Sequence, residues 1–133
     1  MFLETKDKLI VLAGPSGSGK TWITSQLKDF DIVDADKNSF VEALSKAVNP
    51  IVSITVGIST FTKSNPHLEI QLILIKEAED VIKSRLENRG GTFTLAVKKR
   101  MARFSKLEKF AKFIGTSEQV LNYIKSHVSS EPL

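Results

Sequence analysis

Cysteine is absent from this sequence, and histidine occurs only twice. Without cysteine the chain can form neither a disulfide bond nor a cysteine-ligated zinc site, and its natural setting is a reducing interior. The two histidines, His67 and His127, lack the spacing of metal ligands, and no Ser-His-Asp or Cys-His set can be assembled. We therefore expect neither histidine-bound metal chemistry nor a hydrolase of the triad type.

Long hydrophobic runs are also missing, because no apolar stretch approaches the ~20 residues of a membrane span. The charged residues within 1–8 lead directly into a predicted strand, which leaves no room for a secretion signal. We expect a cytoplasmic protein with no membrane partner. With 41% hydrophobic and 26% charged residues, positions 1–133 are expected to form a single compact domain.

The most informative feature that is present is a phosphate-binding loop at residues 14–21, GPSGSGKT. It matches G-x-x-x-x-G-K-[ST] in full, follows an apolar run and precedes a helical pattern, which is the context that the motif requires. Its glycines let backbone N–H groups turn toward a phosphate, the next helix presents its positive end, and the lysine adds a charge. We expect this loop to bind a nucleoside triphosphate, with Thr21 also a Mg²⁺ ligand, through Gly14, Ser16, Gly17, Ser18, Gly19, Lys20 and Thr21.

Hydrophobic patterns predict strands at 8–13, 30–34, 51–58, 68–75 and 113–115. Helices are predicted at 19–28, 39–48, 76–88, 93–113 and 117–127, the last opened by a capping box that starts at Thr116. In the first of these helices Trp22, Ile23 and Leu27 form an apolar stripe, which assigns Trp22 to the core.

The alternation of strands and helices predicts an α/β fold, namely a three-layer α/β/α P-loop NTPase fold. Its sheet is expected to be mostly parallel, with about four to five strands. Ligands of such sheets bind beyond the carboxyl ends of the strands. The segments to inspect are therefore 14–21, 34–37, 57–60 and 76–79.

Two carboxylates, Asp34 and Asp36, end the second predicted strand. One could hold Mg²⁺ while the other accepts the proton of an attacking hydroxyl, as in-line phosphoryl transfer requires. In the alternative interpretation either aspartate caps the following helix. The strand predicted at 51–58 contains no carboxylate where a Walker B acid is expected, so metal binding falls to Thr21 and the Asp34/Asp36 pair. This absence argues against a motor-type ATPase.

Arginines flank a glycine pair in the C-terminal half of the chain. Arg85 and Arg89 precede Gly90-Gly91, and Arg100 and Arg103 follow in the next predicted helix. Each guanidinium can engage two phosphate oxygens and the glycines allow closure, so we expect an arginine-bearing helical lid at about 85–104. The alternative is that these arginines form surface ion pairs of little energetic value.

Positive charge is concentrated at residues 98–112, although the net charge is only +4. This basic segment holds Lys98, Lys99, Arg100, Arg103, Lys106, Lys109 and Lys112. It could attract nucleic acid, close over the phosphates of a small substrate, or form a solvated helix face.

With these residues, the chain resembles small members of the P-loop nucleoside and nucleotide kinase superfamily. The loop at 14–21 and the segment 82–90 are similar to the phosphate loop and lid entry of guanylate kinases, with Arg100 or Arg103 matching the arginine that follows. Where guanylate kinases carry an acceptor domain, this chain has only 34–49. Its Asp34-Ala35-Asp36 element resembles the D-x-D of shikimate kinase and the acceptor-side aspartate of gluconate and polynucleotide kinases.

The resemblance implies ATP as donor, Asp36 toward the acceptor, Asp34 on the metal side and a loop containing Thr116 against the adenine base. We predict an ATP- and Mg²⁺-dependent phosphotransferase acting on a small nucleotide, nucleoside or other hydroxyl acceptor, with catalytic residues Lys20, Asp36, Arg85, Arg89 and Arg100. Two alternatives stay open. One is a kinase for the 5′-hydroxyl of nucleic acid bound through 98–112, and the other is a nucleotide-binding regulator or inhibitor without catalysis.

Overall fold

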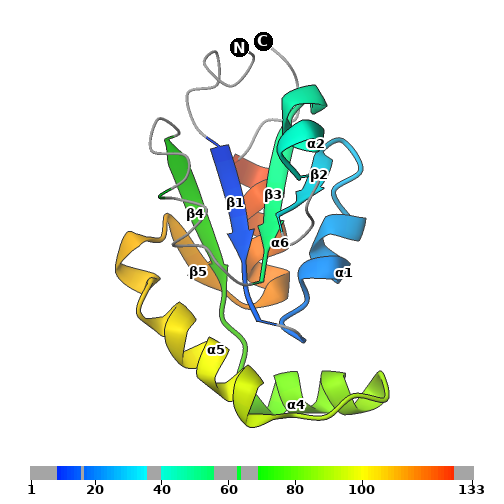
Figure 1. Ribbon diagram of the computed structural model, residues 1–133, viewed down its shortest axis with the longest axis vertical. Helices are drawn as coiled ribbons and strands as arrows, with labels where there is room; N and C mark the ends of the chain where they lie inside the picture. The colour runs from blue at the N-terminus through cyan, green and yellow to red at the C-terminus, as the bar shows by residue number, and fades with distance from the viewer. Residues whose placement is uncertain (1–8, 16, 36–39, 56–62, 64–68, 128–133) are drawn as a thin grey trace.

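A single five-stranded sheet organises the molecule, and all of its strand pairs are parallel. The computed structural model describes residues 9–15, 17–35, 40–55, 63 and 69–127. The strand order is β2-β3-β1-β4-β5, with bounds β1 Leu9–Ala13, β2 Asp31–Asp34, β3 Pro50–Ile54, β4 Ile70–Ile75 and β5 Phe113–Gly115 (Figure 1). The predicted α/β class with a parallel sheet is confirmed.

Helices connect the strands and cover the sheet. They are α1 Lys20–Ser25, α2 Phe40–Lys46, α4 Glu79–Asn88, α5 Leu95–Ser105 and α6 Ser117–His127, together with the 3₁₀ turn η2 Glu108–Phe110. Figure 1 shows α4 and α5 beyond the carboxyl ends of the strands, at the end of the sheet where the phosphate-binding loop leaves β1. A ligand of a parallel sheet is expected at this end.

Alternating side chains of the strands fill two separate cores. On one face of the sheet, Val11, Val52 and Leu74 pack with Leu44 of α2, and Phe104 of α5 lies against the same cluster. On the other face, the neighbouring strand positions pack with α1 and α6, in a cluster that includes Leu12, Ile51, Ile73, Ile23, Val120 and Ile124. Because side chains of a strand point to opposite faces in turn, this alternation produces the predicted three layers.

A third and smaller cluster joins α4 to α5. Ile82 and Leu86 of α4 pack with Val97 of α5, and Phe93 and Met101 cover them. The predicted arginine-bearing segment is therefore a helical hairpin with its own apolar contacts.

Several predicted boundaries were wrong, and at three of them pairing within the sheet sets where the element begins or ends. The helix predicted at 93–113 ends at Ser105, since the Lys112 N–H donates to Leu72 O at 2.7 Å and places β5 beside β4. The helix predicted from residue 76 begins at Glu79, since the Lys76 N–H donates to Gly115 O at 2.7 Å. The strand predicted at 51–58 begins at Pro50 and ends at Ile54, level with the end of β1 at Ala13, and residues 56–58 lie outside the described ranges.

The capping box predicted at the start of α6 is confirmed. The Gln119 N–H donates to Thr116 Oγ1 at 3.3 Å, and the Thr116 N–H donates to Gln119 Oε1 at 2.9 Å. These reciprocal bonds satisfy backbone donors that a helix start leaves unpaired. They fix the first turn of α6 beside the phosphate-binding loop.

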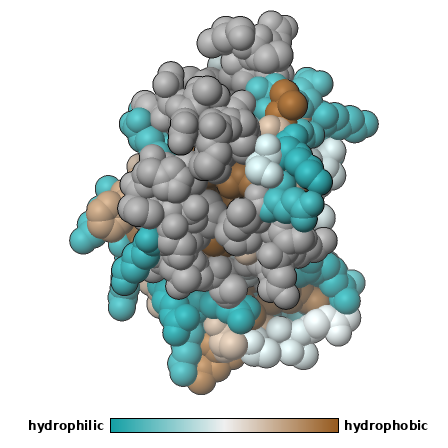
Figure 2. All heavy atoms as spheres, turned by 45° about the horizontal axis from the view of Figure 1, so that its top comes forward, coloured by the Kyte–Doolittle hydropathy of each residue, from teal (hydrophilic) through white to brown (hydrophobic). Residues whose placement is uncertain are grey.

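The described surface is mainly polar. Figure 2 shows hydrophilic side chains over much of the coloured surface on one face, with hydrophobic atoms in separate patches. Exposed large hydrophobic side chains among the described residues are Trp22, Ile32, Val48, Leu95 and Phe110. In the part of the chain that the structure describes, no helix is long and apolar enough to cross a membrane.

The glycine pair after α4 forms a Schellman cap. Gly90 has a φ of +79°, its N–H donates to Glu87 O at 3.0 Å, and the Gly91 N–H donates to Leu86 O at 2.8 Å. These bonds satisfy the last carbonyls of the helix, and they require the left-handed conformation at Gly90. The pair therefore ends the helix that carries Arg85 and Arg89.

Replacing Gly90 by alanine should lower the free energy of unfolding by about 1 kcal/mol, because a side chain disfavours the left-handed conformation. A Cβ at Gly90 would meet nothing within 4 Å, so backbone strain is the only expected penalty. Gly90→Asn is the matched control and should lose less, since asparagine tolerates this conformation. Urea unfolding of the three proteins measures the effect, and equal stability of Gly90→Ala and the unaltered protein would contradict this account of the cap.

Candidate functional site

The phosphate-binding loop has the backbone conformation that its sequence predicts. Gly17 and Gly19 have φ values of +83° and +100°, which are left-handed conformations that glycine adopts without strain. The Ile23 N–H donates to Gly19 O at 2.9 Å, so α1 grows directly out of the loop. Ser16 lies outside the described residues. A left-handed residue next to ordinary ones turns successive N–H groups inward, which makes a concave site for an anion.

Two helices hold this loop from outside. A Cβ added to Gly17 would lie 3.1 Å from side-chain atoms of Ile82 and Leu86 in α4. A Cβ added to Gly19 would lie 2.7 Å from the Cβ of Ser117 at the start of α6. Packing therefore disfavours a side chain at Gly19 strongly and at Gly17 more mildly, in addition to the strain of their left-handed conformations.

Inside the loop, polar groups are available for a phosphate. Lys20 Nζ donates to Gly14 O at 2.7 Å, which places the ammonium group against the start of the loop. Ser18 is fully buried, and its Oγ has no hydrogen-bond partner among the described residues. This hydroxyl lies against Gly14, so the groups that fit an anion are the inward-turned amides of the loop and the Lys20 ammonium. The residues present thus fit a triphosphate tail.

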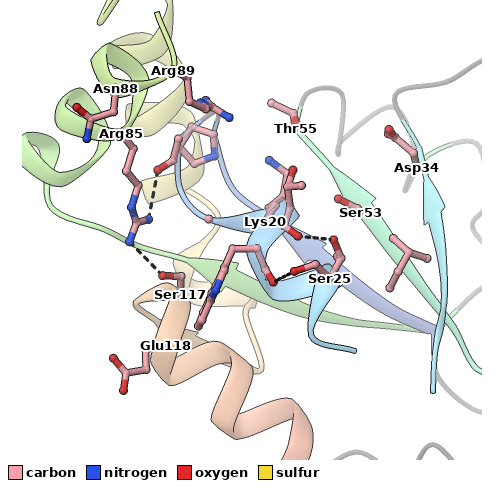
Figure 3. Close-up of a pocket in the computed structure, with 17 residues that line it drawn as sticks. Lys20, Ser25, Asp34, Ser53, Thr55, Arg85, Asn88, Arg89, Ser117 and Glu118 are labelled. Atoms are coloured by element: carbon pink, nitrogen blue, oxygen red, sulfur yellow. Dashed lines mark hydrogen bonds between the residues drawn. The ribbon is translucent and has the colours of Figure 1, made fainter. Parts of the chain in front are cut away.

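A buried carboxylate organises the neighbouring arginine. Glu77 Oε2 lies 2.8 Å from Nη2 of Arg85 and accepts from Ser117 Oγ at 2.9 Å, and the Glu77 side chain is only 7% exposed. Arg85 also donates to Gly17 O and to Ser117 Oγ, each at 3.3 Å (Figure 3). This network, the Glu77–Arg85–Ser117 brace, ties α4 and α6 to the tip of the loop. The sequence analysis marked 76–79 for inspection and a loop containing Thr116 for the base, but it assigned no role to the Glu77 or Ser117 side chain.

A cleft of about 970 Å³ opens in front of the loop. One wall is the end of α4, with Arg85, Asn88 and Arg89. The opposite wall is the edge of the sheet, with Asp34, Ser53 and Thr55. Figure 3 shows Lys20 between Arg89 on one side and Asp34, Ser53 and Thr55 on the other. This volume suits a nucleotide or another small ligand.

The sheet-edge wall follows from strand register. Asp34 ends β2 and pairs with Ser53 of β3, and Thr55 comes directly after β3. The sequence-based strand at 51–58 had directed attention to 57–60, which lies outside the described residues. Ser53 and Thr55 were therefore missed because the predicted end of β3 was too late. Their hydroxyl groups occupy the position where a Walker B acid was expected.

Thr21 and Asp34 remain the candidate Mg²⁺ ligands, and both line the cleft. No cluster of three or more His, Cys, Asp or Glu side chains that could hold a metal occurs within the described ranges. Such a cage is not needed for Mg²⁺, which is usually bound by one or two protein oxygens, waters and substrate phosphates. One hydroxyl and one carboxylate therefore fit this ion.

Several predicted site residues lie elsewhere. Arg100 is on α5 and Thr116 caps α6, and neither lines the cleft. Asp36 lies outside the described residues. The roles assigned to these three residues stay predictions. Gly14 and Ser18 are in the loop but do not line the cleft, because Ser18 is buried beneath it and a Cβ at Gly14 would lie 2.6 Å from Ser18 Oγ.

The assignment of Trp22 to the core was wrong. Trp22 is 46% exposed and lines the cleft. Ile23 of α1 and Leu27, just after the helix, are both buried in the core cluster on this face of the sheet. Trp22 is displaced by one residue, about 100° around α1, which turns it out of the core.

The basic segment 98–112 lies outside the cleft lining. Part of its charge is paired at the start of α4, where Lys98 Nζ is 3.7 Å from Oε1 of Glu79. At its other end Phe110 is 68% exposed, and the Lys109 ammonium lies 5.2 Å from the centre of the Phe110 ring. A basic surface with an exposed aromatic ring is thus present, separate from the cleft.

Comparisons with known proteins show which solved structures have a similar fold. No protein-family model matches the chain, and no curated protein matches its sequence. Among solved structures, a shikimate kinase from Bacteroides thetaiotaomicron is similar with a TM-score of 0.62 and 13% identity, over 90% of this chain and 96% of that one. A sugar kinase from Janibacter gives a TM-score of 0.65 and 16% identity, over 91% and 94%. A gluconokinase from Sinorhizobium meliloti gives a TM-score of 0.55 and 13% identity, over 87% and 88%.

At these identities the likeness establishes architecture alone. The structural match extends over nearly the full length of this chain and of the first two similar chains. The chain therefore has the α/β fold of small P-loop kinases.

Proposed function

We propose that this protein is an ATP- and Mg²⁺-dependent phosphotransferase that moves the γ-phosphate to a small acceptor. One observation carries the proposal. A phosphate-binding loop with its lysine lies in a single cleft between an arginine wall and a wall of one carboxylate and two hydroxyl groups. Phosphoryl transfer needs this arrangement, because positive charge must face the transferring group while an acceptor approaches in line.

The roles follow from position. Loop amides and Lys20 hold the β- and γ-phosphates, and Thr21 and Asp34 hold Mg²⁺, which when bound neutralises charge on the phosphate oxygens. Asp36, two residues after Asp34 in the sequence, orients or deprotonates the acceptor. Ser53 and Thr55 offer hydroxyl groups to the acceptor side of the cleft.

The arginines divide into a fixed and an exposed group. Arg85 is held by Glu77 against Gly17 O, so its guanidinium is preorganised beside the loop. Arg89 is exposed, and Figure 3 shows its guanidinium directed into the cleft. Both neutralise charge during transfer, whereas Arg100 contributes only if α5 moves toward the cleft.

A small hydroxyl-bearing acceptor is favoured over GMP. The similar structures are named for shikimate, sugar and gluconate phosphorylation, which supports this acceptor class. The likeness of the loop and lid to guanylate kinases stays a hypothesis. Transfer of labelled γ-phosphate to a panel of sugars, hydroxy acids, nucleosides, nucleotides and oligonucleotide ends would identify the acceptor.

A 5′-hydroxyl kinase of nucleic acid is the second candidate. The observation that favours it is the exposed Phe110 ring beside Lys109 in the basic segment. Aromatic rings stack with unpaired bases, and lysines neutralise the backbone of a single strand. A nucleotide-binding regulator without catalysis would also use the phosphate-binding loop, but it would not need Asp34, Ser53 and Thr55 in the sheet-edge wall.

Asp34→Asn should reduce phosphate transfer by about a hundredfold or more while leaving ATP binding largely intact, because it weakens metal binding at the reacting phosphates. Lys20→Ala should abolish both. Asp29→Asn is the matched control, since Asp29 is exposed and does not line the cleft. Transfer assays and calorimetry with MgATP on the same preparations measure the two effects.

If Asp34→Asn retains full biological activity while Lys20→Ala loses it, the regulator replaces the kinase as the better account. If the unaltered protein binds ATP but transfers phosphate to no member of the acceptor panel, the proposed activity is refuted.

Phe110→Ala should weaken binding of a single-stranded oligonucleotide by about tenfold if the basic segment binds nucleic acid, because one base–ring stack is lost. Leu95→Ala is the control, since Leu95 is similarly exposed at 67% on the first turn of α5. Fluorescence anisotropy at two salt concentrations measures the affinity, which should fall steeply with salt and lose part of that dependence in Lys106→Glu. Affinity that is insensitive to salt and to Phe110→Ala removes this candidate.

A further inference from the structure

Trp22 is a large aromatic side chain that is exposed inside the cleft and not buried in the core. It is the chain's only tryptophan, it is 46% exposed, and it lines the same cleft as Lys20 and Ser117. Exposure of an indole within a ligand cleft leaves a flat apolar surface that a ligand can cover. The phosphate chemistry proposed above does not use this surface.

The contacts between α1 and α6 show at which end of the cleft Trp22 lies. Gly19 faces α6, since a Cβ there would lie 2.7 Å from the Cβ of Ser117. Trp22 lies in the first turn of α1, directly after this contact, and α1 packs against α6. The next residue, Ile23, is buried in the cluster that contains Val120 and Ile124 of α6. Trp22 is thus at the α6 side of the loop.

The acceptor wall is on the other side. Figure 3 shows Ser117 and Asp34 on opposite sides of Lys20. A triphosphate held by the loop has its γ-phosphate toward the acceptor, so its sugar and base must leave the loop on the opposite side. That side is where the Trp22 indole and the first turn of α6 line the cleft.

We propose that Trp22 is the stacking platform for the nucleobase of the bound triphosphate, and thus a binding residue of the donor site. The proposal rests on the proposed function only in that a nucleotide is bound by the loop; it does not require transfer. Glu118, also in the cleft lining, offers a carboxylate that accepts from amino groups, as adenine or guanine provide. The indole gives affinity and the carboxylate gives a preference for amino-bearing bases.

Emission from Trp22 tests the proposal directly, because no other tryptophan contributes. The two probes are MgATP and magnesium tripolyphosphate, which offers the phosphates without a base. MgATP should quench the emission in a saturable manner. Tripolyphosphate should leave the emission unchanged and should reverse the quenching by ATP, because it competes for the loop alone.

Substitution provides the second measurement. In calorimetry, Trp22→Ala should bind MgATP about tenfold more weakly than the unaltered protein, the effect expected of one lost base stack. Trp22→Phe keeps an aromatic face and should recover most of that loss. Affinity for tripolyphosphate should be the same in all three proteins, which also shows that the loop remains folded.

Three results would overturn the proposal. Equal quenching by tripolyphosphate would mean that Trp22 reports on the loop and not on a base. Equal losses of affinity for both probes in Trp22→Ala would mean a structural role. No binding of either probe to the unaltered protein would refute the donor site as a whole, whereas quenching by ATP without any phosphate transfer would refute only the kinase activity.

Discussion

The left-handed conformations of Gly17 and Gly19, enclosed by packing, are the constraint on which the rest of the site depends. A side chain at either glycine would strain the left-handed backbone and crowd a neighbouring helix, namely Ile82 and Leu86 of α4 at Gly17 and Ser117 of α6 at Gly19. Arg85 of α4 and Ser117 of α6 also meet Glu77, which lies between β4 and α4, in the Glu77–Arg85–Ser117 brace, so the same two helices position both the loop and the arginine. A preorganised cradle of this kind binds an anion without first having to order its own backbone.

This constraint also explains why the cleft has two unlike ends. The loop lies between the sheet edge, where Asp34 and its neighbours present oxygen atoms, and the first turn of α1, where Trp22 is exposed. Chemistry is proposed at the first end and recognition of the base at the second. The parallel sheet makes this possible because every strand ends at the same edge, so residues far apart in sequence converge there.

Local sequence signals predicted what depends on neighbouring residues. The loop motif, the buried strands and the reciprocal bonds of Thr116 with Gln119 are all properties of short segments, and the structure has them. The sequence could not predict features that arise from long-range pairing. The end of α5 at Ser105, the end of β3 at Ile54, and the burial of Glu77 against Arg85 each depend on contacts between distant segments. Trp22 was misassigned for a related reason, because a hydrophobic stripe on a helix does not reveal which of its edges meets a cleft.

The central claim is that a glycine backbone held by α4 and α6 forms a triphosphate cradle. Calorimetry of MgATP binding to the unaltered protein and to Gly19→Ala tests it most directly, with circular dichroism as a check that both are folded. The account predicts saturable binding by the unaltered protein and binding weaker by about tenfold or more in Gly19→Ala, because the added methyl group strains the backbone and meets Ser117. Absence of binding to the unaltered protein, or equal affinity in a folded Gly19→Ala variant, would contradict it.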